Sequence, residues 1–221
     1  MAELTFTSKI TVEEIQSMGD DTTIVAAARV STRGWDAIPS AESAGLIGYL
    51  MKNRHGTPFE HGSLTVRVHA PIKVWREWHR HRVGWSYNEE SGRYKQLDPV
   101  FYIPPPDFGL ATPEQYEAIC DSLKEGYAHA YGHYEDMLEM GADRGLARDV
   151  LGVGIYSACY CTANPRSIMH FLELRTRRDD AKRPSRPLWE INKAADQLEA
   201  IFAARWPITH AAWLASGRAA P

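Results

Sequence analysis

The chain has 221 residues and a mass of 24.9 kDa, with 44% hydrophobic and 24% charged residues, as is ordinary for a globular domain. Its formal net charge of -3 argues against a general nucleic-acid binder, because such proteins carry a basic excess. The three cysteines suggest no disulfide framework, no apolar run approaches membrane-spanning length, and the start lacks the pattern of a secretion signal. We therefore expect a single cytoplasmic domain over residues 1–221.

The first predicted elements are two helices, at 22–31 and 41–55, which are rich in Ala, Leu and Met after small polar starts. Alternation of Leu64, Val66 and Val68 with polar residues predicts a half-buried strand at 61–70. A helix then opens at Pro71, where the missing N–H costs nothing, and runs to about Arg82.

The second half is predicted to be mainly helical. A loop passing into a strand covers 87–103, followed by a long helix at 113–140 and a further helical segment at 144–160. Another helix follows at 164–175, then a polar loop at 176–187 and a final amphipathic helix at 188–206. Helices segregated from a few strands predict the α+β class.

The stretch WREWHRHRVGWSYNEESGR, from Trp75 to Arg93, concentrates cations in a chain that is acidic overall. On a helix from Pro71, one side carries Val74, Trp75 and Trp78 toward the core, and the opposite side carries Arg76, Glu77 and Arg80. A solvated face with an internal Glu77–Arg80 pair is one interpretation. The other is an anion site, because the hydroxyls and guanidinium groups that a phosphate requires follow at once, in Ser86, Asn88, Ser91 and Arg93.

Arg175 is a second anomaly, because it projects into the apolar stripe formed by Ile168, Phe171 and Leu172. A buried guanidinium costs several kcal/mol unless it is paired. Either it extends outward from the last turn of the helix, or it is a charge aimed into a pocket that holds an anionic or carbonyl-rich ligand.

The segment RHGTPFEH, residues 54–61, leaves two alternatives open. Arg54, His55, Gly56 and Thr57 read like the nucleophilic motif of histidine phosphatases, although that motif follows a strand and this one ends a predicted helix. His55, Glu60 and His61 also offer metal ligands, at irregular spacing. Cys159 and Cys161 lie in an apolar segment and are expected in the core.

Taken together, these motifs resemble the flavin-dependent thymidylate synthases, whose signature reads Arg-His-Arg, a short gap, Ser, and then Ser-x-Arg. The matching residues are Arg80-His81-Arg82, Ser86 and Ser91-Gly92-Arg93. The resemblance extends, in order, over AARVS (27–31), HGTPFEH (55–61), FYIP (101–104), NPRSIMHFLELR (164–175) and WEI (189–191).

The resemblance implies a homotetramer of mixed α/β fold with active sites shared between subunits. It implies FAD as cofactor, NADPH and methylenetetrahydrofolate as co-substrates, and transfer of a one-carbon unit to C5 of a uridylate nucleotide. The matching positions that would contact FAD are Ser31, His55, Thr57, Glu60, Arg80, His81, Arg82, Asn88, Glu89, Asn164, Arg166 and His170. Those that would hold the nucleotide are Glu77, Arg80, Glu89, Ser91, Gly92, Arg93, Arg148 and Arg175.

The resemblance also implies that Arg175 is the catalytic residue, which would face the uracil and favour its N3-deprotonated form. Residue chemistry agrees, because a cation beside the N3–O4 edge stabilises the anionic base and makes C5 nucleophilic. No protein nucleophile is then needed, and none of the three cysteines lies in a motif typical of one.

Three departures from the family pattern bear on the substrate. Val83, Gly84 and Trp85 separate Arg82 from Ser86, one residue more than usual, and position 170 is His where Asn is more common. The segment 176–188 is longer than the family's link and has Pro187-Leu188 in place of an Ala-Gln pair. A surface loop would explain the longer segment.

The first and last departures fall on the substrate side, and they suggest a pocket that accepts UMP, with or without dUMP, as in a methylase of the polyoxin-type nucleoside antibiotic pathway. Glu77 could then accept a hydrogen bond from a ribose hydroxyl. Two other classes stay open: a histidine-type phosphohydrolase, resting on residues 54–56, and a non-catalytic nucleotide- or RNA-binding module.

Overall fold

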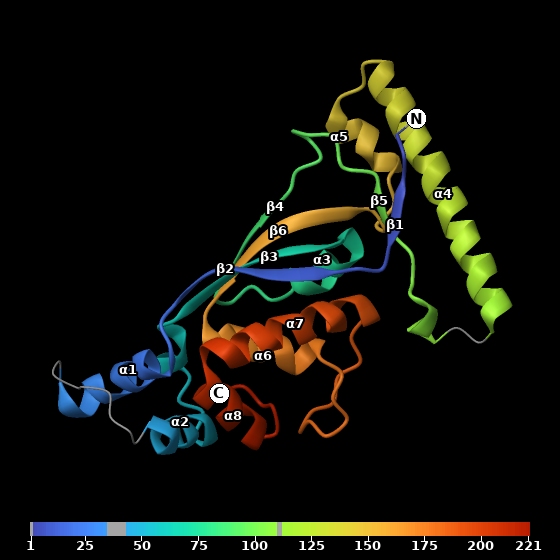
Figure 1. The fold of residues 1–221 in the computed structure, drawn as a ribbon. Coiled ribbons are helices and arrows are strands. Elements are labelled where there is room, and N and C mark those ends of the chain that lie inside the picture. Colours follow the sequence, from blue (N-terminus) through green and yellow to red (C-terminus); the bar gives the residue numbers. More distant parts are fainter. Residues whose placement is uncertain (1, 35–42, 110–111) are drawn as a thin grey trace. The chain divides into compact units, whose positions relative to one another are not determined.

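The structure is a computed structural model that describes residues 2–34, 43–109 and 112–221 (Figure 1). The chain divides into two compact units. Unit 1 comprises Met1–Ile10, His69–Arg76 and Glu89–Cys159. Unit 2 comprises Thr11–Val68, Glu77–Asn88 and Tyr160–Pro221.

Unit 1 is built on a short parallel strand pair and a long helix. Strand β1 (Thr5–Thr7) pairs with β5 (Val100–Tyr102), with Thr5 opposite Val100. Helix α4 (Pro113–Glu139) begins at a Thr112 side-chain cap. Helix α5 (Arg144–Ala147) and two 3-10 turns, at Pro106–Phe108 and Arg148–Val150, complete it. The core of this unit contains Leu97, Phe101, Tyr131, Tyr134, Ala147 and Ile155.

A four-stranded sheet runs in the order β2 (Thr11–Met18), β3 (Ser63–Pro71), β6 (Tyr156–Ala163) and β4 (Trp85–Glu89). Helix α3 (Ile72–Trp78) follows β3 directly. Its residues Val74, Trp75 and Trp78 are buried, as the helical spacing predicted.

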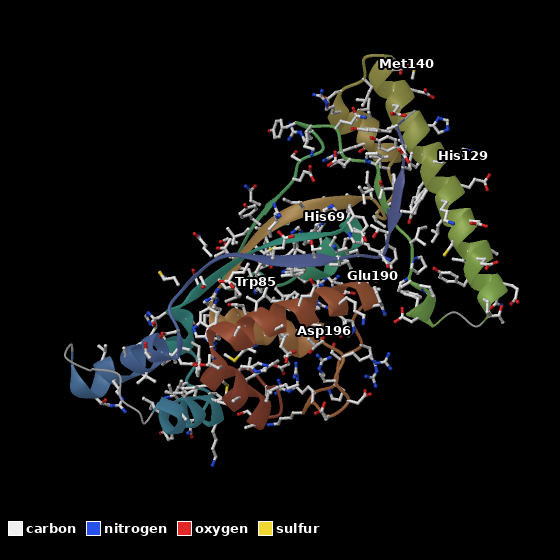
Figure 2. All side chains as sticks on the ribbon, viewed as in Figure 1. His69, Trp85, His129, Met140, Glu190 and Asp196 are labelled. Atoms are coloured by element: carbon white, nitrogen blue, oxygen red, sulfur yellow. The ribbon has the colours of Figure 1, made fainter. Side chains whose placement is uncertain are left out.

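Unit 2 holds most of the helices: α1 (Asp21–Arg33), α2 (Ser43–Lys52), α6 (Pro165–Arg175), α7 (Trp189–Arg205) and α8 (Pro207–Ala215). A 3-10 turn, Thr57–Glu60, precedes β3. Helix α7, which carries Glu190 and Asp196 (Figure 2), packs against both α6 and α8. Trp206 and Trp213 are fully buried here.

Local sequence explains where α6 begins. The Asn164 side chain accepts a hydrogen bond from the Ser167 N–H at 2.9 Å, and Pro165 occupies the first helical position. Both features are typical of a helix start, because the first N–H groups have no partner within the helix. The predicted helix at 164–175 is confirmed almost to the residue.

The mixed α/β class is confirmed, and so are the strand at 61–70 and the long helix at 113–140. The helix expected over 71–82 ends already at Trp78. Strands β1, β2 and β4 and helix α8 were not predicted. Residues 41–42 of the helix expected at 41–55 lie outside the described part of the chain.

The helical segment expected at 144–160 is wrong beyond Ala147. Helix α5 ends at Ala147, and strand β6 begins at Tyr156. The Ala- and Cys-rich sequence of β6 resembles that of a helix. In the structure, however, Cys159, Cys161 and Ala163 are buried while Tyr160 between the cysteines is 47% exposed. That alternation belongs to a strand. The cysteines are core residues as expected, and none of the three forms a disulfide.

None of the described helices combines the length and apolar character needed to cross a membrane.

Candidate active site

The Arg-His-Arg motif opens onto a cavity of about 470 Å³ in unit 2. One wall is the segment from Arg80 to Trp85, and the other is the first half of α6 together with Glu60. A neighbouring cavity of about 530 Å³ shares Glu60, Gly84, Trp85 and Asn164 with it. The two cavities therefore form one cleft around the same loop.

The loop from Val83 to Trp85 is fixed against the start of α6. The Ser167 hydroxyl donates to the Val83 carbonyl at 2.8 Å, and the Trp85 indole N–H donates to the Ser167 carbonyl at 3.3 Å. Gly84 has a φ of +68°, and a Cβ there would lie 2.2 Å from the Ser167 hydroxyl. Only glycine fits this approach. The extra residue of the family signature is thus part of a tight, ordered contact.

Aromatic rings pack against the same loop. Trp85 stacks on Tyr87 with ring centroids 5.7 Å apart, and Trp78 packs on Phe171 at 4.5 Å. The Tyr87 hydroxyl donates to the His81 carbonyl at 2.6 Å, which ties the Arg-His-Arg turn to β4. The geometry of the turn is therefore set by packing.

Arg175 is drawn inward and is held by three hydrogen bonds. Its Nη1 donates to Glu77 Oε2 at 2.9 Å, its Nη2 to the Glu77 carbonyl at 3.3 Å, and its Nε to His81 Nε2 at 3.0 Å. The Arg175 side chain is 16% exposed. The alternative in which Arg175 extends outward is wrong, and Glu77 pairs with Arg175 instead of with Arg80.

His81 is a neutral acceptor in this arrangement. Burial, together with the charge of Arg175 and the neighbouring His170, lowers the pKa of its imidazole to about 4. Its Nε2 accepts from Arg175, so near pH 7 the ring proton lies on Nδ1. A charged imidazole at that position would repel the guanidinium.

The cavity itself is electropositive. Arg80 and Arg82 are exposed, and neither forms an ion pair with any residue in the described ranges. Arg166 donates to Glu60 at 2.5 Å and to the Pro221 carbonyl oxygen at 2.9 Å. A Cβ on Gly56 would lie 2.4 Å from the Arg166 guanidinium, so a glycine lets this arginine reach the cavity. Such a donor set suits an anion.

The predicted cofactor residues are gathered only in part. Seven of the twelve line the cavity: Glu60, Arg80, His81, Arg82, Asn164, Arg166 and His170. Four others lie in unit 2 outside that lining: Ser31, His55, Thr57 and Asn88. Glu89 lies in unit 1, where its carboxylate accepts from Ser157 at 2.7 Å.

The predicted nucleotide residues fall into two groups. Glu77, Arg80 and Arg175 belong to unit 2, whereas Glu89, Ser91, Gly92, Arg93 and Arg148 belong to unit 1. Within unit 1, Gly92 closely approaches Arg148, since a Cβ on the glycine would lie 3.2 Å from the Arg148 Cδ. The Ser91 hydroxyl accepts from the Arg93 N–H at 3.3 Å. The Ser91 hydroxyl and the Arg148 side chain thus both lie next to Gly92, and these residue types suit a phosphate.

Four cavity residues were absent from the sequence-based set: Val83, Gly84, Trp85 and Ser167. The signal for Ser167 was available, because it lies three residues after the Asn164 cap and therefore faces the mouth of the helix. Gly84 is a glycine inside the motif, which often marks a close backbone approach.

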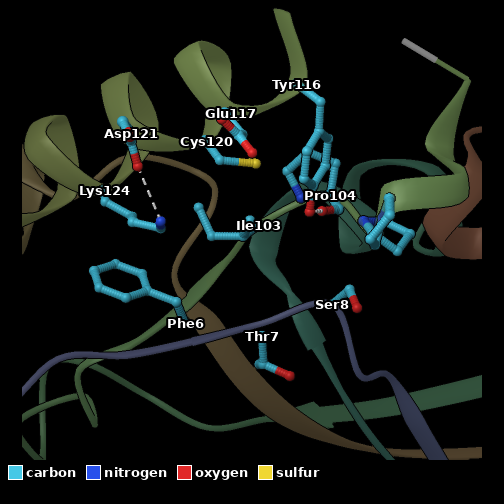
Figure 3. Close-up of a pocket in the computed structure, with 12 residues that line it drawn as sticks. Phe6, Thr7, Ser8, Ile103, Pro104, Tyr116, Glu117, Cys120, Asp121 and Lys124 are labelled. Carbon is cyan, nitrogen blue, oxygen red and sulfur yellow. Dashed lines mark hydrogen bonds and ion pairs between the residues drawn. The ribbon is translucent and has the colours of Figure 1, made fainter. Parts of the chain in front are cut away.

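A larger cavity of about 650 Å³ lies in unit 1, between β1 and α4 (Figure 3). Its charged lining residues include Glu117 and Asp121, and Lys124 is already paired with Asp121 at 3.0 Å. None of the predicted site residues lines it, so we do not assign it to the chemistry.

Within the described residues, no three His, Cys, Asp or Glu side chains group as a metal site, so His55, Glu60 and His61 are not one.

Comparison with known proteins shows the family of this chain. The family model "Thymidylate synthase complementing protein" matches residues 14–208. The chain belongs to this family, the flavin-dependent thymidylate synthases, and is an enzyme of their methyltransferase type.

Two relatives and one solved structure are similar to this chain over almost its whole length. A flavin-dependent thymidylate synthase of Streptomyces coelicolor is 49% identical, over 97% of this chain and 94% of that protein. One of Tropheryma whipplei is 44% identical, over 98% of this chain and 97% of the other. The crystal structure of a UMP/dUMP methylase, PolB from Streptomyces cacaoi, bound with 5-Br dUMP, superposes with a TM-score of 0.95 at 42% identity, covering 99% of this chain and 100% of that one.

Proposed function

We propose that this protein transfers a one-carbon unit from methylenetetrahydrofolate to C5 of a uridylate nucleotide, UMP or dUMP, with FAD bound and NADPH as reductant. The observation that carries the proposal is the Arg175 guanidinium, which is held on three sides by Glu77 and His81. PolB from Streptomyces cacaoi, which has been crystallised with both 5-Br dUMP and 5-Br UMP, supports the choice of substrate.

The chemistry of Arg175 follows from its remaining donors. A guanidinium has five N–H groups, and three of them are used by His81 and Glu77. One N–H on each terminal nitrogen is left for a ligand. Two adjacent donors match the N3 and O4 acceptors of a uracil that has lost its N3 proton, and so favour that anionic form. The extra electron density makes C5 the nucleophile.

Glu77 and His81 act as positioning residues for this arginine. Glu77 neutralises part of its charge and fixes its plane, and neutral His81 accepts from Nε without repelling it. Glu77 Oε1 remains available as an acceptor, which is compatible with a hydrogen bond from a ribose 2′-hydroxyl. That acceptor is our basis for proposing UMP beside dUMP.

The residues of the cavity fit a flavin dinucleotide. Arg80, Arg82 and Arg166 supply cations for a pyrophosphate, and Asn164 and Ser167 add polar groups at the start of α6. When bound, the flavin supplies the redox chemistry that the transfer of a one-carbon unit requires. The protein residues bind it, orient it and keep cationic donors around its phosphates.

The nucleotide phosphate is assigned to Ser91, Arg93 and Arg148. These residues belong to unit 1, and Arg175 belongs to unit 2. We propose that the complete site forms in a homotetramer in which subunits share residues, as the family resemblance implies.

The test measures the flavin absorbance of the purified protein and the methylated nucleotide that it forms. The purified protein should be yellow with flavin absorbance, and should convert UMP, dUMP or both to the 5-methyl nucleotide when NADPH and methylenetetrahydrofolate are supplied. Colourless protein that releases phosphate would indicate the phosphohydrolase instead. Product from dUMP but none from UMP would end the ribonucleotide part of the proposal and leave the rest intact.

A further inference from the structure

A cationic cavity of about 500 Å³ in unit 2 has no part in the chemistry described so far. It lies at the end of α2, beside α8 and the loop 176–188. Its rim holds Lys52, Arg54, Lys182 and Arg183, and its remaining lining is mostly glycine and alanine. No carboxylate is among its lining residues.

These cations lack counter-charges. Lys52, Arg54 and Lys182 are exposed and form no ion pair in the part of the chain that the structure describes. Arg183 alone has a partner, Glu173, at 3.2 Å. Like charges in one cavity repel each other, and the unbalanced field attracts an anion with more than one charge.

Arg54 occupies a position where glycine is strongly preferred. It follows α2 with a φ of +59°, its N–H donates to Met51 at 3.2 Å, and the His55 N–H donates to Leu50 at 2.9 Å. This is a helix-terminating Schellman motif, whose left-handed residue is usually glycine. An arginine is less stable there than glycine. Its side chain is therefore kept against a local conformational preference, which points to a role.

The same cavity borders the proposed flavin cavity through one short segment. Ala219 and Ala220 line the cationic cavity, and the next residue, Pro221, accepts a hydrogen bond from Arg166 of the flavin cavity at 2.9 Å. Glu173 on α6 holds this segment by accepting from the Ala220 N–H at 3.0 Å. The Lys182 N–H donates to Gly217 at 3.0 Å, so the loop 176–188 is fixed to the same segment.

We propose that this cavity binds the glutamate tail of the folate co-substrate, so that Lys52, Arg54 and Lys182 pair with successive carboxylates. The inference rests on the proposed function, because the pteridine end must reach the flavin cavity while the charged tail leads away from it. Single cations from separate segments match carboxylates that are spaced along a chain. The glycine and alanine lining leaves room for the methylene groups between them.

Besides the nucleotide and flavin phosphates, which are assigned to other residues, the reaction would bring the phosphate of NADPH. A phosphate favours several donors that converge on one group, as guanidinium forks and backbone N–H groups do. The two lysines and two arginines of the rim are divided between the C-terminal end of α2 and the loop 176–188, and do not converge from one segment. The observations therefore favour the glutamate chain, and the NADPH phosphate is kept as an outcome of the test.

The test compares tails of different length by calorimetry on the flavin-loaded enzyme. Tetrahydrofolate with five glutamates should bind about tenfold more tightly than tetrahydrofolate with one, as expected for a few exposed ion pairs. Lys52→Gln and Lys182→Gln should each reduce this ratio about threefold, and the double variant should bring it close to one. Lys9→Gln, which removes a cation from unit 1, is the matched control and should keep the full ratio.

The variant Arg54→Gly tests whether a loss of tail binding could result from misfolding. It should reduce the preference for the long tail while the melting temperature stays equal or rises, because glycine relieves the left-handed backbone. Equal binding of both tail lengths by the parent enzyme overturns the proposal, as does an unchanged ratio in the double variant.

A higher KM for NADPH in these variants, with the tail ratio intact, would instead assign the cavity to the dinucleotide phosphate. The proposed function is judged separately, by whether the parent enzyme methylates a uridylate with the monoglutamate folate.

Discussion

Two clusters in unit 2 contain the same three residue types and differ in what lies at their centre. In one, Arg175 is central and is surrounded by Glu77 and His81. In the other, Glu199 is central and accepts from Arg218 and from His210, the latter at 3.1 Å. Arg178 lies 3.6 Å from the same carboxylate and also binds Asp196.

The difference shows how to recognise a site among buried charges. Although burial opposes its ionisation, hydrogen bonds from His210 and Arg218 hold the pKa of Glu199 below its usual value, and its cationic partners outnumber it. Arg175 keeps two N–H groups without a partner among the described residues and faces a neutral histidine. The central Glu199 carboxylate is surrounded by its cationic partners and stabilises the fold, whereas the central Arg175 has N–H groups left for a ligand.

The largest expected effect is on Arg175. Arg175→Ala should lower the rate of uridylate methylation by about 10²–10³-fold, because it removes the group proposed to stabilise the base anion. Arg175→Lys should be almost as slow, since one ammonium cannot replace a planar fork. Flavin absorbance should stay near the parent value. Single-turnover product formation measures this, with Arg186→Ala, an exposed arginine paired with Asp179, as control. A rate within tenfold of the parent would refute the role.

Glu199→Ala should show the opposite pattern. Removing the central carboxylate leaves Arg218, whose side chain is 9% exposed, without its partner, and we expect a loss of about 3 kcal/mol in the free energy of unfolding. The kcat of the folded fraction should be unchanged. Urea unfolding beside a turnover assay checks both. A fall in kcat with normal stability would mean that the two clusters are not distinguished as we infer.

Contacts between distant segments explain why the sequence predicted only part of this site. The position of Arg175 in the apolar stripe of α6 was visible from helical spacing. Its partner Glu77 was not, because the two lie 98 residues apart and meet only through the fold. Periodicity instead suggested the local pair of Glu77 with Arg80. A charge can be recognised as anomalous from sequence, but its partner cannot.

The fold shows the same division between local and long-range information. Helix α6 has its own start signals in Asn164 and Pro165, and was predicted closely. Strand β6, YSACYCTA, mixes alanines with strand-favouring tyrosines and a threonine, and its place between β3 and β4 in the sheet decides that it is a strand. Strand β2 has mostly exposed residues, so its hydrophobic alternation is weak.

The pH dependence of stability tests whether His81, the partner of Arg175, is neutral. The pKa of this imidazole is about 4 in the folded protein and near 6.5 when unfolded, so between these values the unfolded chain binds the extra proton. The stability that neutral His81 contributes is complete above pH 6.5 and is lost as the pH falls toward 4. The slope is at most about 1.4 kcal/mol per pH unit. His81→Gln, which can still accept from Arg175, should have a shallower slope in urea unfolding between pH 6.5 and 4.5. An identical slope would show that the imidazole is not neutral.

Substitution of Arg82 has the smallest expected effect, and it separates residues that bind FAD from residues that act on the uracil. It is exposed and unpaired within the described residues, and it lines the proposed flavin cavity. Arg82→Ala should weaken FAD binding about tenfold, as for one cation on a pyrophosphate, while saturating FAD restores most of the methylation rate. Flavin retained after gel filtration and FAD titration measure this. Arg175 should behave in the reverse way, keeping flavin and losing rate. If both alanine variants lose flavin equally, Arg175 belongs to the cofactor site and the free N–H groups of its cluster are not directed at the base.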